Sequence, residues 1–210
     1  MKKLVIFDFD GTLGHLDVDY DGLRSRLREY FLRHGIDMVF RPLQKTVLEA
    51  VRKVGTKSAL TETGRIIDGF ETERVENARV AEDVHDVLRN LKRMGHSVAI
   101  LSNNGEVVIR KLLERHGLLG YFDFIATRNN VPEVKPSSKG ILMIMEKLGF
   151  RNREDVIMVG DSMYDMISAE KAGVKPVCVM GSEHSPEVRN QGKYTVLKNL
   201  SEIYGYLSNQ

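Results

Sequence analysis

Four aspartates follow short apolar segments of the chain. Asp8 and Asp10 come directly after the apolar segment Leu4–Phe7, and Asp161 and Asp165 come shortly after a second one. Residues i and i+2 of an extended chain point to the same side, so the carboxylates of the first pair leave their segment together. Carboxylates that converge need raised pKa values or a bound cation. Ligands that are all oxygen, and few in number, favour Mg²⁺ over Ca²⁺.

A hydroxyl group and a lysine also lie just before predicted helices. Ser102 and Asn103 end another apolar segment just before a predicted helix, and Lys135 precedes a further helix. A hydroxyl, the free N–H groups of a helix start and an ammonium suit a phosphate. Taken singly, helix capping also explains Ser102 and the pair Ser162 and Asp165, and a solvated loop explains Lys135. Together the acids, the metal and the anion site point to phosphoryl transfer.

Parallel strands would bring these side chains together. Short apolar runs without polar alternation are typical of strands buried on both faces of a parallel sheet. Amphipathic stretches between them predict helices, three of which end in glycine. The alternation predicts an α/β fold with a doubly wound parallel, Rossmann-like sheet, which binds ligands beyond the carboxyl ends of its strands. The predicted strands are Leu4–Phe7, Ser97–Leu101, Phe122–Ala126, Val156–Val159, Pro176–Val179 and an edge strand Thr195–Leu197; the predicted helices are Val84–Met94, Glu106–His116, Ile141–Leu148 and a last one capped by Asn199 and Glu202.

The connection between the first two strands is too long for this pattern. About 90 residues separate Asp8 from Ser102, whereas a whole strand–helix–strand unit takes roughly 30. The apolar spacing within the connection is helical. We therefore expect residues 16–81 to form an inserted small helical domain, and residues 1–15 and 82–210 to form the core that carries the sheet.

The inserted domain is expected to hold an even number of helices. Antiparallel helices with short loops return the chain to the side where it entered only if their number is even. Helices at about Val18–His34 and Pro42–Val54 leave a third stretch, Ser58–Val80. We expect this stretch to break at Gly64 or Gly69 and so to make a further round trip.

An even number of antiparallel helices also places the loop between the second and third helices on the side that faces the first-strand aspartates. Its residues Lys53, Thr56 and Lys57 are therefore candidates to bind a carboxylate or a second phosphate of a substrate. His15 is a candidate at the mouth of the site. The alternatives are a solvated charged turn for the loop and a solvated hinge residue for His15.

The composition excludes several other classes of protein. Lys and Arg number 31 and Asp and Glu number 29, a net charge of +2, which disfavours a dedicated nucleic-acid binder. The single cysteine, Cys178, allows no internal disulfide and suits a reducing compartment. No apolar run approaches a membrane span or a signal-peptide core. We expect a soluble, cytoplasmic protein whose partner is a small molecule.

Four motifs, in this order, resemble those of the haloacid dehalogenase superfamily of phosphatases and phosphomutases. Asp8-Phe9-Asp10-Gly11-Thr12-Leu13 is similar to the first motif, Ser102 to the second, Lys135 to the third and Gly160-Asp161-Ser162-x-x-Asp165 to the fourth. The resemblance covers residue 3 to about 180. The insertion lies where this family carries its helical cap of the first type, so the resemblance implies a Rossmann-like catalytic core with a helical cap domain.

The resemblance implies a reaction and two central residues. Asp8 would be the nucleophile that forms an aspartyl-phosphate, and Asp10 would protonate the leaving oxygen and then activate water. The implied protein is a Mg²⁺-dependent phosphatase for a small phosphomonoester, phosphoglycolate-like or a sugar phosphate. A phosphomutase of the β-phosphoglucomutase type would use the same motifs and is the alternative. A signalling receiver fits less well, because its phosphorylated aspartate follows the third strand, where this chain has Thr127-Arg128-Asn129. A non-catalytic binding protein would be expected to have lost one of the motifs.

The resemblance also implies ligands for the metal and the phosphate. The implied Mg²⁺ ligands are Asp8, the backbone carbonyl of Asp10, and Asp161, with Asp165 in support; the implied phosphoryl ligands are Ser102, the amide of Asn103, and Lys135.

Overall fold

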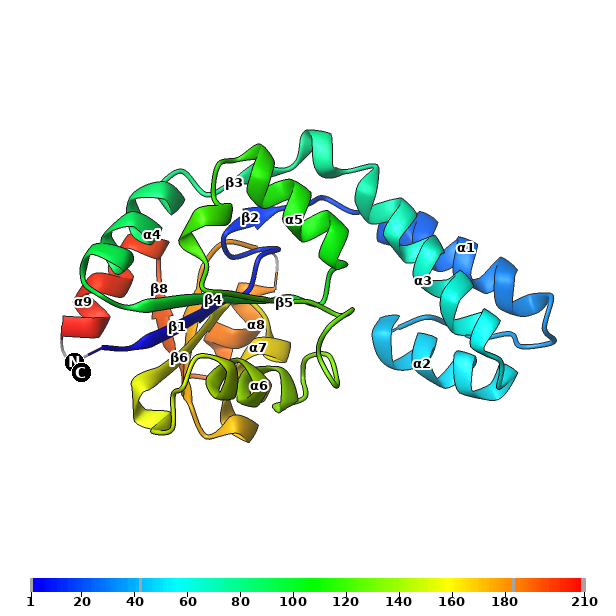
Figure 1. The fold of residues 1–210 in the computed structure, drawn as a ribbon. Coiled ribbons are helices and arrows are strands. Elements are labelled where there is room, and N and C mark those ends of the chain that lie inside the picture. The colour runs from blue at the N-terminus through cyan, green and yellow to red at the C-terminus, as the bar shows by residue number, and fades with distance from the viewer. Residues whose placement is uncertain (1, 42, 183, 209–210) are drawn as a thin grey trace. The chain divides into compact units, whose positions relative to one another are not determined.

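Six parallel strands form one sheet (Figure 1). The computed structural model describes residues 2–41, 43–182 and 184–208. The spatial order of the six strands is β5-β4-β1-β6-β7-β8. The strand nearest the N-terminus, β1, therefore lies between two strands that come much later in the chain. The doubly wound α/β fold predicted from the sequence is thereby confirmed. The strands are β1 Leu4–Phe7, β4 Ser97–Leu101, β5 Phe124–Ala126, β6 Val156–Gly160, β7 Lys175–Val179 and β8 Thr195–Leu197.

Strand β1 is the centre of the sheet. All four of its residues are fully buried. Leu4 pairs with Ser97 of β4 on one side and with Val156 of β6 on the other. A strand with neighbours on both edges and helices on both faces must be apolar throughout, which is why its sequence shows no alternation.

Strand β5 begins two residues later than predicted. The 3₁₀ turn Leu119–Tyr121 precedes it, and the ladder with β4 opens only at the pair Ala99 and Phe124. Asp123 occupies the position before this pair, where its carboxylate accepts the backbone N–H of Val98 at 2.9 Å. A side chain thus takes over a hydrogen bond that an earlier strand start would have made from the backbone.

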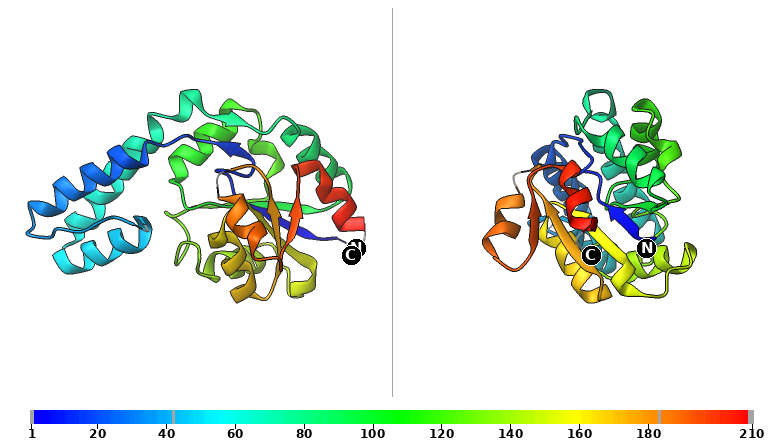
Figure 2. Two further views of the ribbon diagram at one scale, coloured as in Figure 1. Left: turned by 180° about the vertical axis from the view of Figure 1, so that it is seen from behind. Right: turned by 90° about the vertical axis from the view of Figure 1, so that its left-hand side faces the viewer.

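Helices cover both faces of the sheet (Figures 1 and 2). Helices α4 and α5 lie on one face, and α6 and α7 lie on the other. The three glycines predicted to end helices, Gly95, Gly117 and Gly149, all have positive φ, as a helix C-terminus favours. In the described part of the chain, no helix is long and apolar enough to cross a membrane. The helices are α4 Val84–Arg93, α5 Glu106–Arg115, α6 Lys139–Lys147, α7 Met163–Ala172, α8 Ser185–Asn190 and α9 Ile203–Ser208.

The chain divides into two compact units, of which the sheet unit comprises Met1–His15 and Ala78–Gln210. The helical unit comprises Leu16–Asn77. At the edge of the sheet unit, β2 (Gly14–His15) pairs antiparallel with β3 (Arg79–Val80). Two-residue strands carry no readable pattern, and the sequence analysis did not predict them. Gly14 is required here because a Cβ would lie 2.6 Å from the carbonyl oxygen of Arg79.

The helical unit contains three α-helices in its described residues: α1 Tyr20–Leu32, α2 Leu43–Val54 and α3 Lys57–Thr72. The prediction that the third stretch breaks at Gly64 or Gly69 is wrong, because α3 runs through both. A glycine costs a helix about 1 kcal/mol relative to alanine. Packing of α3 against α1 and α2 offsets this cost. Pro42, the predicted start of the second helix, lies outside the described residues.

Extended chain, rather than a fourth helix, makes one pass of the helical unit. After α1 the segment 36–40 has no regular structure and runs back beside that helix. Arg28 hydrogen-bonds Asp37 at 2.6 Å, and Arg41 further on hydrogen-bonds Asp21 at 3.1 Å. The number of helices therefore does not decide which end of the unit carries the loop between α2 and α3. An even number of helices therefore no longer supports the expectation that this loop faces the aspartates after β1.

The sheet core predicts a large effect of truncating an inward-facing side chain of α4. Leu88 is fully buried, so Leu88→Ala should lower the free energy of unfolding by about 2–5 kcal/mol through lost burial and a cavity. Val107→Ala on α5 is the matched control, because that side chain is 62% exposed. Urea unfolding of both variants tests this, and equal losses would contradict the packing described here.

Candidate active site

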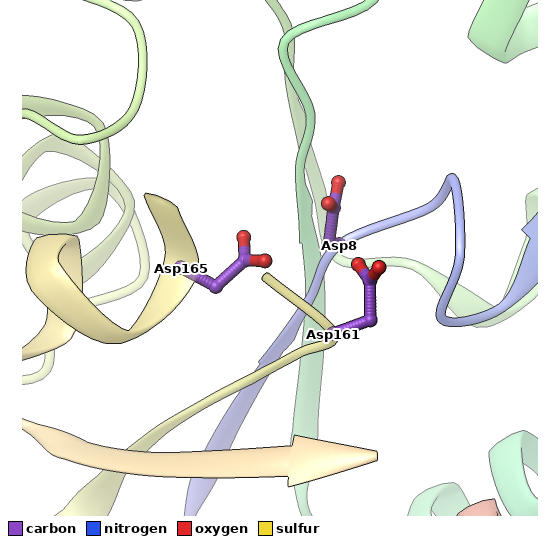
Figure 3. Close-up of side chains that lie close together, drawn as sticks. All are labelled: Asp8, Asp161 and Asp165. Carbon is purple, nitrogen blue, oxygen red and sulfur yellow. The ribbon is translucent and has the colours of Figure 1, made fainter. Parts of the chain in front are cut away.

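Three buried carboxylates meet at the carboxyl ends of β1 and β6. Asp8 follows β1, Asp161 follows β6, and Asp165 lies in the first turn of α7. Their exposed fractions are 8%, 2% and 0%. One oxygen from each carboxylate lies within 4.8 Å of the other two, and Figure 3 shows the three side chains close together. We call these three residues the carboxylate cluster.

A tight turn after β1 brings the chain against the cluster. The N–H groups of Thr12, Leu13 and Gly14 all donate to the carbonyl oxygen of Phe9, at 2.9–3.1 Å. Gly11 has φ of 82°, a conformation that L side chains rarely adopt. A Cβ on Gly11 would also lie 2.4 Å from a carboxylate oxygen of Asp161. The Asp-Gly step of the first motif is therefore fixed by both backbone conformation and space.

Asp165 has a structural and an electrostatic role at once. Its Oδ2 accepts hydrogen bonds from the N–H and the hydroxyl of Ser162, at 3.1 and 2.7 Å, which caps α7. The capping pair considered in the sequence analysis is thus present. Its Oδ1 accepts from Lys135 Nζ at 2.6 Å. Both oxygens of Asp165 are thus hydrogen-bonded, and its supporting position beside a metal, which the resemblance implies, stays a prediction.

Lys135 lies between two members of the cluster. Its Nζ is 2.8 Å from Asp8 Oδ2 and 2.6 Å from Asp165 Oδ1, and the residue is 3% exposed. Asn103 holds the lysine backbone from both sides. Its side-chain oxygen accepts the Lys135 N–H at 2.9 Å, and its side-chain nitrogen donates to the Lys135 carbonyl at 3.1 Å. The loops carrying the second and third motifs are thereby joined.

The carboxylate cluster carries more negative charge than its lysine can balance. Burial raises the pKa of Asp8 well above its ordinary value, Lys135 opposes this, and the other two aspartates add to it. Burial and the charge of Asp165 raise the pKa of Asp161 to about 6. Burial alone would lower the pKa of the Lys135 ammonium, but the carboxylates of Asp165 and Asp8 raise it above its usual range.

A divalent cation fits this group of residues. Three carboxylates face one ammonium, so the fully ionised cluster has an excess of two negative charges that are removed from water. Buried charges of one sign must be protonated or compensated. All the available cluster ligands are oxygens, which hard cations such as Mg²⁺ and Ca²⁺ prefer. The cluster contains three of the four aspartates named from the sequence as metal-site residues, and the carboxylate of the fourth, Asp10, is not part of it.

The carboxylate of Asp10 lies outside the cluster. Its side chain is 22% exposed, and His15 Nδ1 lies 3.6 Å from Asp10 Oδ1. An isolated backbone β-bridge between Asp10 and Gly14 closes the turn. Of the metal ligands expected from the resemblance, Asp10 was assigned through its backbone carbonyl, and its carboxylate was assigned a different role. His15 is 62% exposed at its side chain, beside this acid.

Ser102 is buried and joined to Asn104. Its hydroxyl donates to the Asn104 side-chain oxygen at 2.9 Å and accepts the Asn104 N–H at 3.2 Å. This is a local hydrogen-bonded turn, whereas the helix capping considered for Ser102 from the sequence is not observed, because Gly105 is the N-cap of α5. The turn leads into α5, which begins at Glu106.

The remaining candidates, Lys53, Thr56 and Lys57, belong to the helical unit. Thr56 caps α3 by accepting the N–H of Ala59 at 3.2 Å, and Lys53 pairs with Glu49 at 2.9 Å. Lys57 is the first residue of α3. These are ordinary local roles, and substrate contact by the three residues stays a prediction.

The sequence analysis missed Ser182, whose hydroxyl donates to Asp161 Oδ2. The signal was present, because Ser182 is among the first polar residues after the apolar run that becomes β7. The rule that polar residues at strand ends meet at one edge of the sheet applies to it as well. Cys178, by contrast, is fully buried, and burial with the nearby aspartates raises its thiol pKa to about 11, as expected of an unreactive core residue.

The buried ion pairs predict a pH-dependent effect of removing Lys135. Without metal at pH 7, Lys135→Met should cost about 3–5 kcal/mol of unfolding free energy, because it leaves buried carboxylates uncompensated. The folded-state pKa of Asp8 is already raised and would rise further. The loss of unfolding free energy in Lys135→Met should therefore become smaller as the pH falls and the Asp8 carboxylate is protonated.

Urea unfolding in EDTA at pH 7 and pH 5 measures this effect. Lys139→Met is the matched control, because Lys139 forms an exposed ion pair with Glu133, of the kind that contributes about 0–1 kcal/mol. Similar losses in both variants would contradict the role given to the buried pairs.

Known proteins resemble this chain over the part that carries the candidate site. The model of a family described as haloacid dehalogenase-like hydrolase matches residues 5–179. A protein of Pseudomonas aeruginosa named phosphoglycolate phosphatase 1 is 28% identical, covering 97% of this chain and 79% of that protein. A pyrophosphatase of Oceanobacillus iheyensis is 25% identical, covering 86% of this chain and 84% of that protein.

A solved structure extends the comparison to the fold. A subfamily IA hydrolase of the same superfamily from Geobacter sulfurreducens superimposes with a TM-score of 0.66 at 21% identity, covering 98% of this chain and all of that one. The family match spans every strand from β1 to β7 and all four motifs. The chain belongs to the haloacid dehalogenase-like hydrolases, and it is an enzyme of that family.

Proposed function

We propose that this enzyme is a Mg²⁺-dependent phosphatase that hydrolyses a small phosphomonoester through a covalent phosphate on Asp8. The observation that carries the proposal is the carboxylate cluster with Lys135 inserted into it. A buried carboxylate beside an ammonium and further acids is a poor structural element, because each ion loses its hydration. Such an arrangement is useful where a metal and a phosphate bring their own charges to the site.

The geometry around Asp8 suits a nucleophile. Lys135 Nζ lies 2.8 Å from its Oδ2, and the backbone N–H of Phe9 donates to its Oδ1 at 2.7 Å. Both contacts fix the carboxylate in one orientation at the end of β1. Preorganisation of this kind lowers the barrier by placing the attacking oxygen before the reaction starts.

The reaction proceeds in two displacements. An oxygen of Asp8 attacks phosphorus, the bond from phosphorus to the ester oxygen breaks, and Asp10 gives its proton to that oxygen. Water then attacks phosphorus, Asp10 takes the proton of the water, and the bond from phosphorus to Asp8 breaks to release phosphate. Asp10 suits this exchange because its carboxylate lies outside the buried cluster and is partly exposed.

The metal would be held by Asp8, Asp161 and the backbone carbonyl of Asp10, with Asp165 in support. When bound, Mg²⁺ offsets negative charge on the phosphoryl oxygens. Lys135 acts on the same charge from the opposite loop, and Ser102 with the Asn103 amide would hold the remaining oxygens. The mutual hydrogen bonds of Asn103 and Lys135 support this arrangement because they keep the two loops in register.

The helical unit is proposed as the cap domain of the enzyme and the sheet unit as its catalytic core. A phosphoglycolate-like ester or a sugar phosphate is the proposed substrate class, since relatives are named for phosphoglycolate. Lys53, Thr56, Lys57 and His15 are the proposed contacts to the part of the substrate beyond the phosphate. The proposed location is the cytoplasm, with no nucleic-acid or membrane partner.

Metal removal tests the proposal most directly. Purified enzyme should hydrolyse p-nitrophenyl phosphate with Mg²⁺, lose this activity in EDTA, and regain it when Mg²⁺ is added back. Ca²⁺ should support it poorly, because its longer and looser coordination misplaces the reacting groups. The release of p-nitrophenol is the measurement, and full activity in EDTA would contradict the proposed metal.

Substitution of the two acids of the first motif tests the covalent step. Asp8→Asn should abolish turnover and leave no phosphorylated protein by intact mass spectrometry. Asp10→Asn should slow hydrolysis of an alkyl phosphate by about 10²–10⁴-fold, and less for p-nitrophenyl phosphate, whose leaving group needs little protonation. Asp86→Asn, on the exposed surface of α4, is the control. Near-normal turnover by Asp8→Asn would exclude the mechanism.

A further inference from the structure

We propose that Ser182 is a positioning residue that fixes the Asp161 carboxylate for binding a divalent metal. The inference rests on the metal site of the proposed function and adds a residue that lies outside all four motifs. Ser182 follows β7, on the loop that leads into α8. Its hydrogen-bond partners Asp161, His184 and Ser185 all belong to the sheet unit.

Two hydroxyl groups hold the Asp161 carboxylate from different loops. Ser182 Oγ donates to its Oδ2, and Thr12 Oγ1 donates to its Oδ1 over 3.4 Å. The hydrogen bond from Thr12 is long, so the serine supplies the stronger restraint. Thr12 belongs to the turn after β1, and Ser182 to a loop near the other end of the chain.

The proton of Ser182 can be assigned by elimination. The backbone N–H of His184 donates to Ser182 Oγ at 3.1 Å, so this hydroxyl acts there as the acceptor. An ionised carboxylate can only accept. The single hydroxyl proton therefore goes to Asp161, and the bond is a charge-assisted one, which is stronger than a bond between neutral groups.

Ser185 fixes the loop that carries Ser182. It is fully buried, its hydroxyl accepts the N–H groups of Gly181 and Ser182, both at 3.2 Å, and it donates to the Val179 carbonyl at 3.1 Å. These bonds tie the loop to the end of β7. Ser182 is thus held from behind while its hydroxyl faces the aspartate.

Two glycines allow this loop to approach the turn after β1. A Cβ on Gly181 would lie 2.6 Å from the carbonyl oxygen of Gly11, and a Cβ on Gly11 would lie 2.4 Å from Asp161. A larger residue at Gly181 would have to move the backbone of Gly11, and one at Gly11 would have to displace the Asp161 carboxylate. The close approach brings Ser182 within hydrogen-bond range of Asp161, so the loop and the turn form one support for the carboxylate.

A restraint on this carboxylate bears on metal affinity rather than on phosphate chemistry. Mg²⁺ demands near-ideal geometry from few protein ligands, and free rotation of a ligand carboxylate is lost when the ion binds. Hydrogen bonds that orient metal ligands contribute about 10–100-fold to metal affinity or activity. Loss of the serine hydroxyl should therefore weaken metal binding while leaving Asp8, Asp10 and Lys135 in place.

Direct metal titration of the full chain tests the proposal. Mn²⁺ binding is followed by the loss of the electron paramagnetic resonance signal of the free ion, and Mg²⁺ by its competition with Mn²⁺. Ser182→Ala should raise the Kd of both ions by about 10-fold or more, and Ser182→Thr should restore affinity to near that of the wild type. Ser201→Ala, which removes an exposed hydroxyl bonded to Asn199, should change nothing.

A second variant disturbs the hydrogen bond between Ser182 and Asp161 without removing the serine. Gly181→Ala should displace the loop from Gly11 and raise the metal Kd, with the serine still present. Hydrolysis of p-nitrophenyl phosphate by Ser182→Ala should return toward the wild-type kcat at saturating Mg²⁺. Circular dichroism confirms that each variant is folded.

The outcomes separate this proposal from the proposed function. An unchanged metal Kd in folded Ser182→Ala overturns the role of the serine, whatever the phosphatase activity. Reduced kcat that saturating Mg²⁺ does not restore, with unchanged Kd, also overturns it. A wild-type enzyme that binds metal with the predicted dependence on Ser182, but hydrolyses no phosphate ester, supports the positioning role and contradicts the phosphatase.

Discussion

Three carboxylates share a buried space with a single ammonium, and the arrangement of the surrounding residues follows from that imbalance. Like charges in a low-dielectric interior repel strongly, and only compensation or protonation relieves them. Lys135 supplies one positive charge between Asp8 and Asp165, and hydrogen bonds supply further compensation. The remaining excess lies on the side of Asp8 and Asp161, where the pKa of each acid is raised.

The sheet order explains why this space exists at the end of β1. The chain runs from β1 outward through β4 and β5 on one side, and through β6, β7 and β8 on the other. The connections that leave β1 and β6 therefore run to opposite sides of the sheet, which makes the point between these two strands the place where such folds bind ligands. Asp8, Asp161 and Lys135 lie on loops and Asp165 lies in the first turn of α7, so short segments that follow rigid strands place most of these side chains.

The sequence predicted the strands and the motif residues because their signals are local. Continuous apolar runs, glycine helix ends and acids that follow strands each depend on neighbours within a few positions. What it did not predict depends on contacts far along the chain. The extended pass beside α1 is defined by pairs such as Arg28 with Asp37, the strands β2 and β3 consist of two residues each, and Ser182 reaches Asp161 only because two loops pack together. The break expected at Gly64 or Gly69 failed for a related reason, since tertiary packing outweighs the helix propensity of one residue.

The central place of β1 has a consequence for the synthesis of the protein. Its earliest partner along the chain, β4, begins only at Ser97, about 90 residues after the end of β1. At about 5–20 residues per second, the four apolar residues of β1 wait roughly 5–20 s for a neighbouring strand. The whole helical unit is made during that interval. The carboxylate cluster joins Asp8 to Asp161 and Asp165, so the acid that follows β1 must wait still longer, until β6 and α7 have been made, before its site can assemble.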